Sequence, residues 1–350
     1  MKYKKLSITL IFMICVLLLT SCNCNCNLFN KKYEVTYFEY FDTITSIIGY
    51  ESNKKTFEKN TTIIKEELAI YNKLYDIYYE YDGVNNLCTI NKNAGIQPVQ
   101  VDQKIIDLLQ YAKKMYDMTD KMVNIAMGSV LKLWHDAREY STLHPNDAYL
   151  PTTKELKEAS MHMDIEKIII DEEKSTVYLA DKDMQIDVGA IAKGYVAERI
   201  AKRLKQEEVS SYVLDIGGNI RTIGTKKKNE KWTIGIKNPN LESEKTNIQI
   251  VEVAEKSVVT SGSYQRYFTV NGIHYHHIIS PITLYPIDNF TSVTVITSDS
   301  GLADALSTAL FNLSIEEGKK LIDSLEDVEA MWIDTNYQIT YSKHFLEYVI

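Results

Sequence analysis

Three short segments combine residue types that could act on a phosphate group. The first, residues 186–194, reads Ile-Asp-Val-Gly-Ala-Ile-Ala-Lys-Gly. We expect a strand to end at Asp187, the chain to turn at Gly189, and a helix to follow whose first turn carries Lys193. Free amides at a helix N-terminus, with an ammonium group nearby, favour an anion such as phosphate. The structural alternative makes Asp187 the helix N-cap and Lys193 a solvated side chain.

The second segment holds three of the seven histidines within four residues: His274, His276 and His277. In a strand, His274 and His276 would share one face and His277 would lie on the other. A zinc site would lack ligands here, because no Cys, Asp or Glu lies within ten residues on either side. A histidine with a near-neutral pKa can instead act as a general base.

The third segment, residues 301–310, places Asp304 and Thr308 four positions apart, which makes them neighbours on one face of a helix. A carboxylate beside a hydroxyl suits a hard cation such as Mg²⁺. The structural alternative places Asp304 in the acidic first turn of the helix, with Thr308 bonding back to a backbone carbonyl.

Periodicity predicts the elements that must position these segments. Residues 35–50 are rich in Thr, Ile and aromatic residues and indicate one or two strands. Apolar residues at three- and four-residue steps predict helices over 63–74, 105–115, 189–205, 302–313 and 315–325. Further strands are expected at 167–170, 176–180, 212–216, 232–236, 248–253, 292–297, 329–334 and 338–341. Helices and strands mix without regular βαβ alternation, so the predicted fold class is α+β.

Composition limits the classes of function. A hydrophobic content of 45% and a charged content of 25% over 350 residues are average for a globular protein and exclude disordered and fibrous classes. The net charge of −8 disfavours nucleic acid and polybasic attachment to anionic lipid. The chain has only five arginines, so a phosphate site would depend mainly on lysine, backbone amides or a metal.

Residues 1–21 have the form of a targeting segment. Three lysines precede a charge-free stretch at 6–20, which at fifteen residues is short for a membrane span of roughly 20. The sequence Leu-Thr-Ser-Cys that ends at Cys22 resembles the lipobox of bacterial lipoproteins, in which the cysteine thiol is lipidated and becomes the new N-terminus. An uncleaved signal anchor is the alternative. In both cases we expect the protein at the extracytoplasmic face of the cell membrane.

The other cysteines indicate neither a set of disulfides nor a zinc site. After Cys15 leaves with the signal peptide, Cys24, Cys26 and Cys88 remain, and three thiols neither form a disulfide framework nor show zinc-site spacing. We therefore expect a lipidated Cys22 with a polar tether over 22–32, and a folded domain over 33–350.

Taken together and in order, the motifs resemble those of the ApbE-type FAD:protein FMN transferases, from residue 35 to the C-terminus. The matching segments are Phe41-Asp42-Thr43, Val123-Asn124 through Leu133-Trp134, the 187–195 turn and helix start, Ile216-Gly217-Gly218-Asn219, Thr260-Ser261-Gly262-Ser263-Tyr264, His277-Ile278-Ile279, and Asp304-Ala305 with Thr308. The resemblance implies an α+β, ApbE-like (T-fold-related) domain of two lobes, with FAD and a metal in the cleft between them.

The resemblance also implies roles for individual residues. Asp304 and Thr308 match side-chain ligands of Mg²⁺, and the carbonyl of Ala190 completes the ligands from the protein. His277 matches the histidine implicated in phosphoryl transfer. The positions that match FAD contacts are Phe41, Tyr78, Met122, Val123, Asn124, Asp187, Lys193 and His276.

Two departures from the family pattern stand out. The family often has Met-Gly where this chain has Phe41-Asp42. The aspartate that usually follows His-Ile-Ile is Ser280 here, so no carboxylate is supplied at that position and we expect a lower pKa for His277 than in relatives.

The function implied by the resemblance is Mg²⁺-dependent cleavage of FAD, with transfer of FMN to a Thr or Ser hydroxyl of a target protein and release of AMP. The expected partner is a membrane-associated electron-transfer flavoprotein with a Ser/Thr-Gly-Ala-Thr/Ser motif, which this chain itself lacks. The alternatives are a Mg²⁺-dependent FAD pyrophosphatase, a non-catalytic FAD-binding lipoprotein and a His-rich metal-binding lipoprotein. Intact Asp304, Thr308 and His277 argue against storage alone, and the lack of clustered carboxylates argues against a metal carrier.

Overall fold

The computed structural model describes residues 30–350 except residue 228. The predicted signal peptide, Cys22 and most of the predicted tether lie outside the described residues. The first strand begins at Lys31, just before the expected start of the folded part. Among the described residues, no helix combines the length and the apolar character that crossing a membrane would require.

A sheet of eight antiparallel strands forms the centre of the molecule, in the order β1-β2-β6-β7-β10-β13-β14-β15. Its strands are β1 (Lys31–Tyr40), β2 (Thr43–Glu51), β6 (Tyr212–Ile216), β7 (Asn219–Ile223), β10 (Ser257–Gly262), β13 (Phe290–Thr297), β14 (Glu329–Asp334) and β15 (Ile339–Tyr341). The strands predicted over 35–50 form the β1–β2 hairpin, and Tyr40 pairs with Thr43. Phe41 and Asp42 make the turn, with φ of 56° and 47°.

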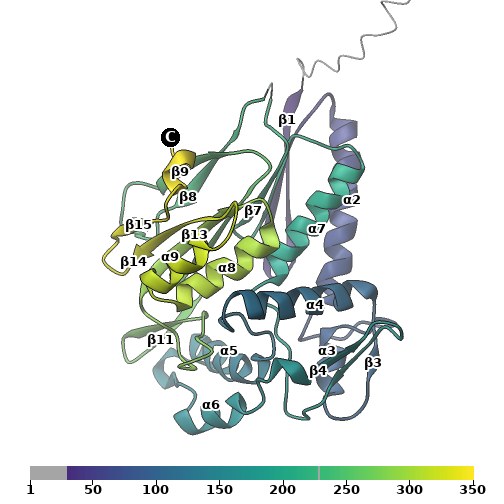
Figure 1. The fold of residues 1–350 in the computed structure, drawn as a ribbon, viewed down its shortest axis with the longest axis vertical. Helices are drawn as coiled ribbons and strands as arrows, with labels where there is room; N and C mark the ends of the chain where they lie inside the picture. Colours follow the sequence, from purple (N-terminus) through teal and green to yellow (C-terminus); the bar gives the residue numbers. More distant parts are fainter. Residues whose placement is uncertain (1–29, 228) are drawn as a thin grey trace, which may run out of the picture.

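Helices cover one face of this sheet (Figure 1). They are α2 (Lys54–Leu74), α7 (Ala192–Gln206), α8 (Ser300–Asn312) and α9 (Ile315–Asp323), and α4 (Gln103–Met118) lies below them and contacts α2. The long helices α2 and α7 run side by side, and α7 also packs along α8. The apolar positions that predicted α2, including Ile64, Leu68 and Tyr71, are buried in the main core with residues of β2 and β6.

A hairpin covers the opposite face of the sheet. It consists of β8 (Trp232–Lys237) and β9 (Asn247–Val253), and the short helix η3 (Phe345–Tyr348) lies against it. Trp232, Val251 and Phe345 are buried there in a second core with residues of β10, β13 and β14. The alternating burial of β8 follows from this packing, because every second side chain points to the sheet.

The remaining elements lie at the lower end of the molecule in Figure 1. They are α3 (Leu87–Lys92), β3 (Val99–Gln100), α5 (Gly128–Leu143), η1 (Pro145–Asp147), α6 (Thr153–Ser160), η2 (Ile165–Lys167), β4 (Ile168–Asp171), β5 (Thr176–Leu179), β11 (Tyr267–Val270) and β12 (Ile273–His276). Trp134 of α5 joins α5 to the β11–β12 hairpin, because its ring packs near Phe268 and Tyr275. Its Nε1 donates to the Leu284 carbonyl at 2.9 Å.

The predicted α+β class is confirmed, and most predicted elements are present. Helix α7 begins at Ala192 and not at 189, because the amides of Ile191 and Ala192 first close a turn on the Val188 carbonyl. Helix α5 was not predicted from the sequence. Its N-cap, Met127, makes no side-chain cap, so the usual start signal is missing.

Two contacts fix α8 against α7. A Cβ on Gly194 would lie 2.3 Å from the Ser300 carbonyl oxygen and 2.4 Å from the Asp304 Cβ, so only glycine allows this approach. The buried carboxylate of Glu198 accepts hydrogen bonds from Arg221 Nε at 2.8 Å and from the Ser300 amide at 3.1 Å. The start of α8 is thereby tied to both α7 and β7.

Gly194→Ala tests this crossing. In an open helix, Gly→Ala stabilises by about 1 kcal/mol. Here we expect the opposite sign, a loss of about 1–3 kcal/mol in the free energy of unfolding from overpacking, measured by urea denaturation. Gly318→Ala in α9 is the control, since its nearest contact is 3.1 Å to the Trp332 side chain and the loss should be smaller. A Gly194→Ala variant that is more stable than wild type would contradict the close contact.

Candidate functional site

The turn before α7 is built on Asp187. Its Oδ1 accepts the Gly189 amide at 2.8 Å, and its own amide donates to the Ile125 carbonyl at 2.9 Å. Asp187 is not the helix N-cap, because that position is Ile191, which provides no side-chain cap. The structural alternative for Asp187 is therefore wrong. Desolvation raises the pKa of this carboxyl, while the Gly189 hydrogen bond and the positive charges of Lys193 and Arg138 act in the opposite direction.

The start of α7 is capped from another helix. The Gly194 amide donates to Asp304 Oδ2 at 2.8 Å, across the α7–α8 crossing. The amides of Ile191 and Ala192 bond to the Val188 carbonyl, so these two amides are not free for an external anion. The anion at this helix N-terminus is the protein's own carboxylate, where the helix dipole favours a negative charge.

Asp304 lies in a buried and incompletely neutralised position. Desolvation raises its pKa, while the Lys193 charge and the Gly194 hydrogen bond act in the opposite direction. It is not the first-turn acid of the structural alternative, because Asp299 caps α8 and Asp304 follows in the next turn. No other side chain or amide among the described residues donates to its carboxylate.

Thr308 lies one turn after Asp304 and is half-buried. Its hydroxyl makes no hydrogen bond within the described part of the chain, so the expected back-bond to a carbonyl is not found. Ser307 does make that bond, from its Oγ to the Asp304 carbonyl at 2.9 Å. The Thr308 hydroxyl is therefore left available for a ligand.

The donor set fits a hard cation. The Asp304 carboxylate and the Thr308 hydroxyl are on one face of α8, and the Ala190 carbonyl, in the turn that leads to α7, accepts no hydrogen bond from the described residues. These are oxygen donors with a single negative charge, which suits Mg²⁺ that keeps waters and substrate oxygens as further ligands. The buried charge of Asp304 also calls for a compensating cation.

The two adjacent histidines have different environments. His276 ends β12 and is buried, with Nε2 donating to the Ile287 carbonyl at 3.1 Å and Nδ1 accepting the Ile278 amide at 3.2 Å. Both ring nitrogens are thus used inside the protein. The structure gives His276 a positioning role and disfavours its predicted role as a cofactor contact.

His277 follows β12 and its ring is exposed. Its Nδ1 lies 3.1 Å from the Arg266 carbonyl, which can only accept, so Nδ1 carries the proton and Nε2 has a free lone pair. Desolvation by surrounding protein atoms lowers the pKa of His277 to about 3, and the charges of Arg266 and Lys193 lower it further. The ring is a neutral base at ordinary pH.

Ser280 does not take part in the electrostatics of His277 through a hydrogen bond. Its buried Oγ accepts the amides of Ile282 and Thr283 at 3.2 and 3.4 Å and so closes the turn that follows β12. An aspartate could cap the same turn, since Asp and Ser both cap their own backbone in this way. The ring hydrogen bond of His277 goes to Arg266 instead.

Lys193 brings the predicted residues together. Its positive charge opposes the raised pKa of Asp187 and of Asp304 and adds to the lowered pKa of His277, and these three groups come from three different parts of the chain. No acid among the described residues forms an ion pair with it, and its Nζ only approaches the Gly189 carbonyl at 3.5 Å. An ammonium group without an ion-pair partner, between two carboxylates and a neutral histidine, is suited to bind an anionic substrate.

The Phe41–Asp42 turn reaches this group through Arg266. The guanidinium of Arg266 donates to the Asp42 carbonyl at 2.9 Å, while its own carbonyl holds His277. The Phe41 amide is fixed by Asn72 Oδ1 at 2.7 Å. Arg266 links strands that lie far apart in sequence, and sequence reasoning did not identify it.

Tyr78 lies in the loop between α2 and α3 and is half-exposed. Desolvation and the charge of Asp187 raise its pKa to about 12. By contrast, the Met122 and Val123 side chains are buried in the main core. The Asn124 side chain bonds to the Met163 carbonyl and the Ala126 amide. These three side chains serve the fold, so their predicted FAD contacts gain no support.

Helix α5 contributes two further residues that sequence reasoning missed. His135 stacks on Tyr78 with ring centroids 5.0 Å apart. Arg138 Nη2 lies 3.1 Å from His135 Nδ1. The positive charge of Arg138 acts on Asp187. Only a correct prediction of α5 would have placed them, since their i, i+3 spacing puts them on one helix face.

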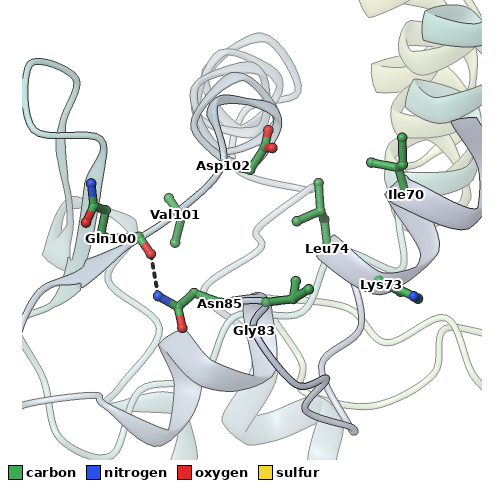
Figure 2. Close-up of a pocket in the computed structure, with 9 residues that line it drawn as sticks. Ile70, Lys73, Leu74, Gly83, Asn85, Gln100, Val101 and Asp102 are labelled. Carbon is green, nitrogen blue, oxygen red and sulfur yellow. Dashed lines mark hydrogen bonds between the residues drawn. The ribbon is translucent and has the colours of Figure 1, made fainter.

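Two other features do not belong to this group. A hollow of about 530 Å³ lies between the end of α2, the loop at Gly83–Asn85 and the start of α4 (Figure 2). It contains none of the predicted site residues. The one group of three potential metal ligands among the described residues is His162, Asp181 and Asp183, and there Lys167 already pairs with Asp181 at 2.7 Å.

Comparison with known proteins places this arrangement in a family. The model of the ApbE family matches residues 32–332. A FAD:protein FMN transferase of Klebsiella pneumoniae is 33% identical over 282 residues, which cover 78% of this chain and 85% of that protein. A FAD:protein FMN transferase of Treponema pallidum is 34% identical and covers 71% of this chain, with 70% of its own length matched.

Solved structures agree on the fold. The ApbE protein of Thermotoga maritima has a TM-score of 0.79 at 28% identity, and the match covers 91% of this chain and 99% of that one. The flavin transferase ApbE of Vibrio cholerae has a TM-score of 0.76 at 23% identity, which bears on the fold alone. The chain therefore belongs to the ApbE family and is an enzyme of the transferase class.

Proposed function

We propose that this chain is an FAD:protein FMN transferase, which attaches FMN through a phosphoester to a Thr or Ser hydroxyl of a target protein. The single observation that carries the proposal is the placement of Lys193, whose charge acts on Asp187, Asp304 and His277 together. The relatives named above support the choice of FAD as substrate.

The proposed reaction exchanges a phosphoanhydride bond of FAD for a phosphoester bond to the acceptor. The acceptor oxygen forms a bond to the FMN phosphorus, and the bond from that phosphorus to the oxygen that bridges it to AMP breaks. His277 Nε2 takes the hydroxyl proton, because its lone pair is free while Nδ1–H is held by Arg266. AMP leaves with the bridging oxygen.

The chain's own residues would hold the substrate for this step. Lys193 neutralises part of the phosphate charge, and Asp187, Tyr78 and the Phe41 turn border the space for FAD. Asp304, Thr308 and the Ala190 carbonyl are the residues that would hold Mg²⁺. Bound there, the ion would supply charge stabilisation for the pyrophosphate, as in other phosphoryl transfers.

Hydrolysis is the second candidate function. The His277 ring is exposed, so water can reach Nε2 as well as a protein hydroxyl. In that case FMN and AMP would be released as free products. The same residues would act, and only the acceptor would differ.

The soluble part, mixed with FAD, Mg²⁺ and a protein domain carrying a Ser/Thr-Gly-Ala-Thr/Ser motif, should yield a covalently flavinylated domain, detected by mass spectrometry. His277→Ala should lower the transfer rate about 10²–10⁴-fold and leave FAD binding nearly unchanged. His274→Ala is the matched control, since that histidine lies exposed in the same hairpin. Because the pKa of His277 is lowered in the free protein, kcat/KM for FAD should persist well below pH 6.5.

Free FMN and AMP without a flavinylated domain would instead favour hydrolysis. A His277→Ala variant with wild-type rates would remove the general-base assignment. Absence of any FAD binding by the wild type would contradict the proposed function as a whole.

Asp304→Asn tests the cation site. The variant keeps an acceptor for the Gly194 amide but removes a buried charge, so without metal at pH 7 it should melt at or above the wild-type temperature. The sign follows from the raised pKa: wild type loses stability relative to the variant as pH rises through the folded pKa. Millimolar Mg²⁺ should raise the wild-type Tm by mass action and leave the variant unchanged.

Asp183→Asn is the control for Asp304→Asn, because Asp183 belongs to the other potential metal group. It should keep the full response to Mg²⁺. If Asp304→Asn is stabilised by Mg²⁺ as strongly as wild type, Asp304 is not the ligand.

We also propose that Cys22 carries a lipid and anchors the enzyme at the extracytoplasmic face of the cell membrane. The lipobox spacing after a fifteen-residue apolar stretch supports this. Mass spectrometry of the mature N-terminal peptide should show lipid on Cys22, and Cys22→Ser should move the protein out of the membrane fraction. A wild-type protein that keeps residues 1–21 and stays in the membrane would favour an uncleaved anchor.

A further inference from the structure

The outer face of α5 carries a group of side chains that the proposed reaction does not use. Trp134 is buried against the β11–β12 hairpin, and the next residue, His135, points about 100° further around the helix. That direction places the His135 ring against Tyr78, with centroids 5.0 Å apart and planes 32° apart. Arg138 lies on the same helix face and completes a group of three side chains.

Hydrogen bonds fix the His135 ring in one state. Arg138 Nη2 lies 3.1 Å from Nδ1, and a guanidinium can only donate, so Nδ1 is the acceptor in this hydrogen bond. The Tyr78 hydroxyl lies 3.4 Å from the same Nδ1 and donates to it as well. His135 thus contacts Tyr78 through both its ring face and its nitrogen.

The loop that carries Tyr78 is itself rigid. Asp76 Oδ1 accepts the amides of Tyr78 and Tyr79 at 2.7 and 3.0 Å, and its Oδ2 accepts the Tyr81 hydroxyl at 2.7 Å. The backbone of Tyr78 therefore cannot adapt freely to a ligand. The angle of its ring is set by what lies against it, and on one side that is His135.

We propose that His135, held by Arg138, is a positioning residue that backs the Tyr78 ring so that the other, accessible side of Tyr78 stacks on an aromatic ring of the substrate. The proposal rests on the proposed function, since FAD has two such rings, the flavin and the adenine. Stacking of planar rings favours an offset geometry, and a ring fixed beforehand binds with less loss of side-chain freedom. Tyr78 is half-exposed, which leaves this side open to the ligand.

The test measures dissociation constants of the protein for FAD, FMN and AMP by flavin fluorescence and by calorimetry. Tyr78→Ala gives the largest loss of FAD affinity to expect, because it removes the whole ring. His135→Ala should weaken FAD binding about 2- to 10-fold, the range of an aromatic pair, and leave kcat at saturating FAD within about twofold. His135→Phe should restore most of the affinity because it keeps a flat ring, and His135→Asn should not, although it keeps an acceptor for Arg138.

His144→Ala is the matched control. His144 follows the end of α5 and stacks on Tyr140 with centroids 4.6 Å apart, so the variant removes the same kind of contact away from Tyr78. It should bind FAD as wild type does. Thermal melting of every variant separates loss of binding from loss of folding.

The outcomes distinguish failure of the positioning role of His135 from failure of the proposed function. Equal affinity of His135→Ala and wild type, with Tyr78→Ala weakened, would overturn the positioning role and leave the proposed function intact. Rescue by His135→Asn but not by His135→Phe would also overturn it. A wild type that binds no FAD would overturn both. An effect on FMN but not AMP identifies the flavin as the stacked ring, and the reverse identifies the adenine.

Discussion

The hydrogen bond from the Gly194 amide to the Asp304 carboxylate is the contact on which the rest of the site depends. It exists because α7 and α8 cross with no side chain between them at Gly194. The carboxylate replaces the missing side-chain cap of α7, because it accepts one of the amides that a helix start leaves without a partner. The same contact sets Asp304 against the turn that carries Ala190, and Glu198 with Arg221 holds the start of α8 in register.

This arrangement leaves positive charge where a phosphate could use it. The Asp304 carboxylate bonds to the start of α7, and the Asp187 carboxylate bonds to the Gly189 amide of its own turn. The His277 ring bonds to the Arg266 carbonyl and is neutral. Among the described residues, Lys193 forms no ion pair with any of these groups. The site keeps its carboxylates buried and its one ammonium group available. In such a setting, a cation near Asp304 and an anion near Lys193 each relieve a charge that the fold leaves uncompensated.

Much of this could be predicted from the sequence, and the limits have physical causes. Strand and helix positions followed from periodicity, and the β6 and β14 bounds were predicted to the residue because short apolar stretches there are cleanly bounded. Helix α5 was not predicted, because no side chain at its N-terminus forms the hydrogen bond that usually marks the start of a helix. The hydrogen bond between Asp304 and Gly194 could not be predicted either, because its donor is a backbone amide, which every residue type except proline has. His276 and His277 look alike in sequence, and only the surrounding carbonyls and amides distinguish a structural ring from a free base.

The surroundings of His277 disfavour a positive charge on its ring. A general base must become an imidazolium during the reaction, yet Arg266 and Lys193 disfavour that cation, and the turn residue Ser280 supplies no carboxylate to offset them. A further source of negative charge next to Lys193 is the substrate itself. Desolvation is the main cause of the lowered pKa of His277 and the lysine charge adds to it, so a pyrophosphate that offsets the lysine charge would raise that pKa. In this arrangement the base gains strength only when the substrate is in place, so the neutral, low-pKa ring of the free enzyme is compatible with proton transfer in the complex.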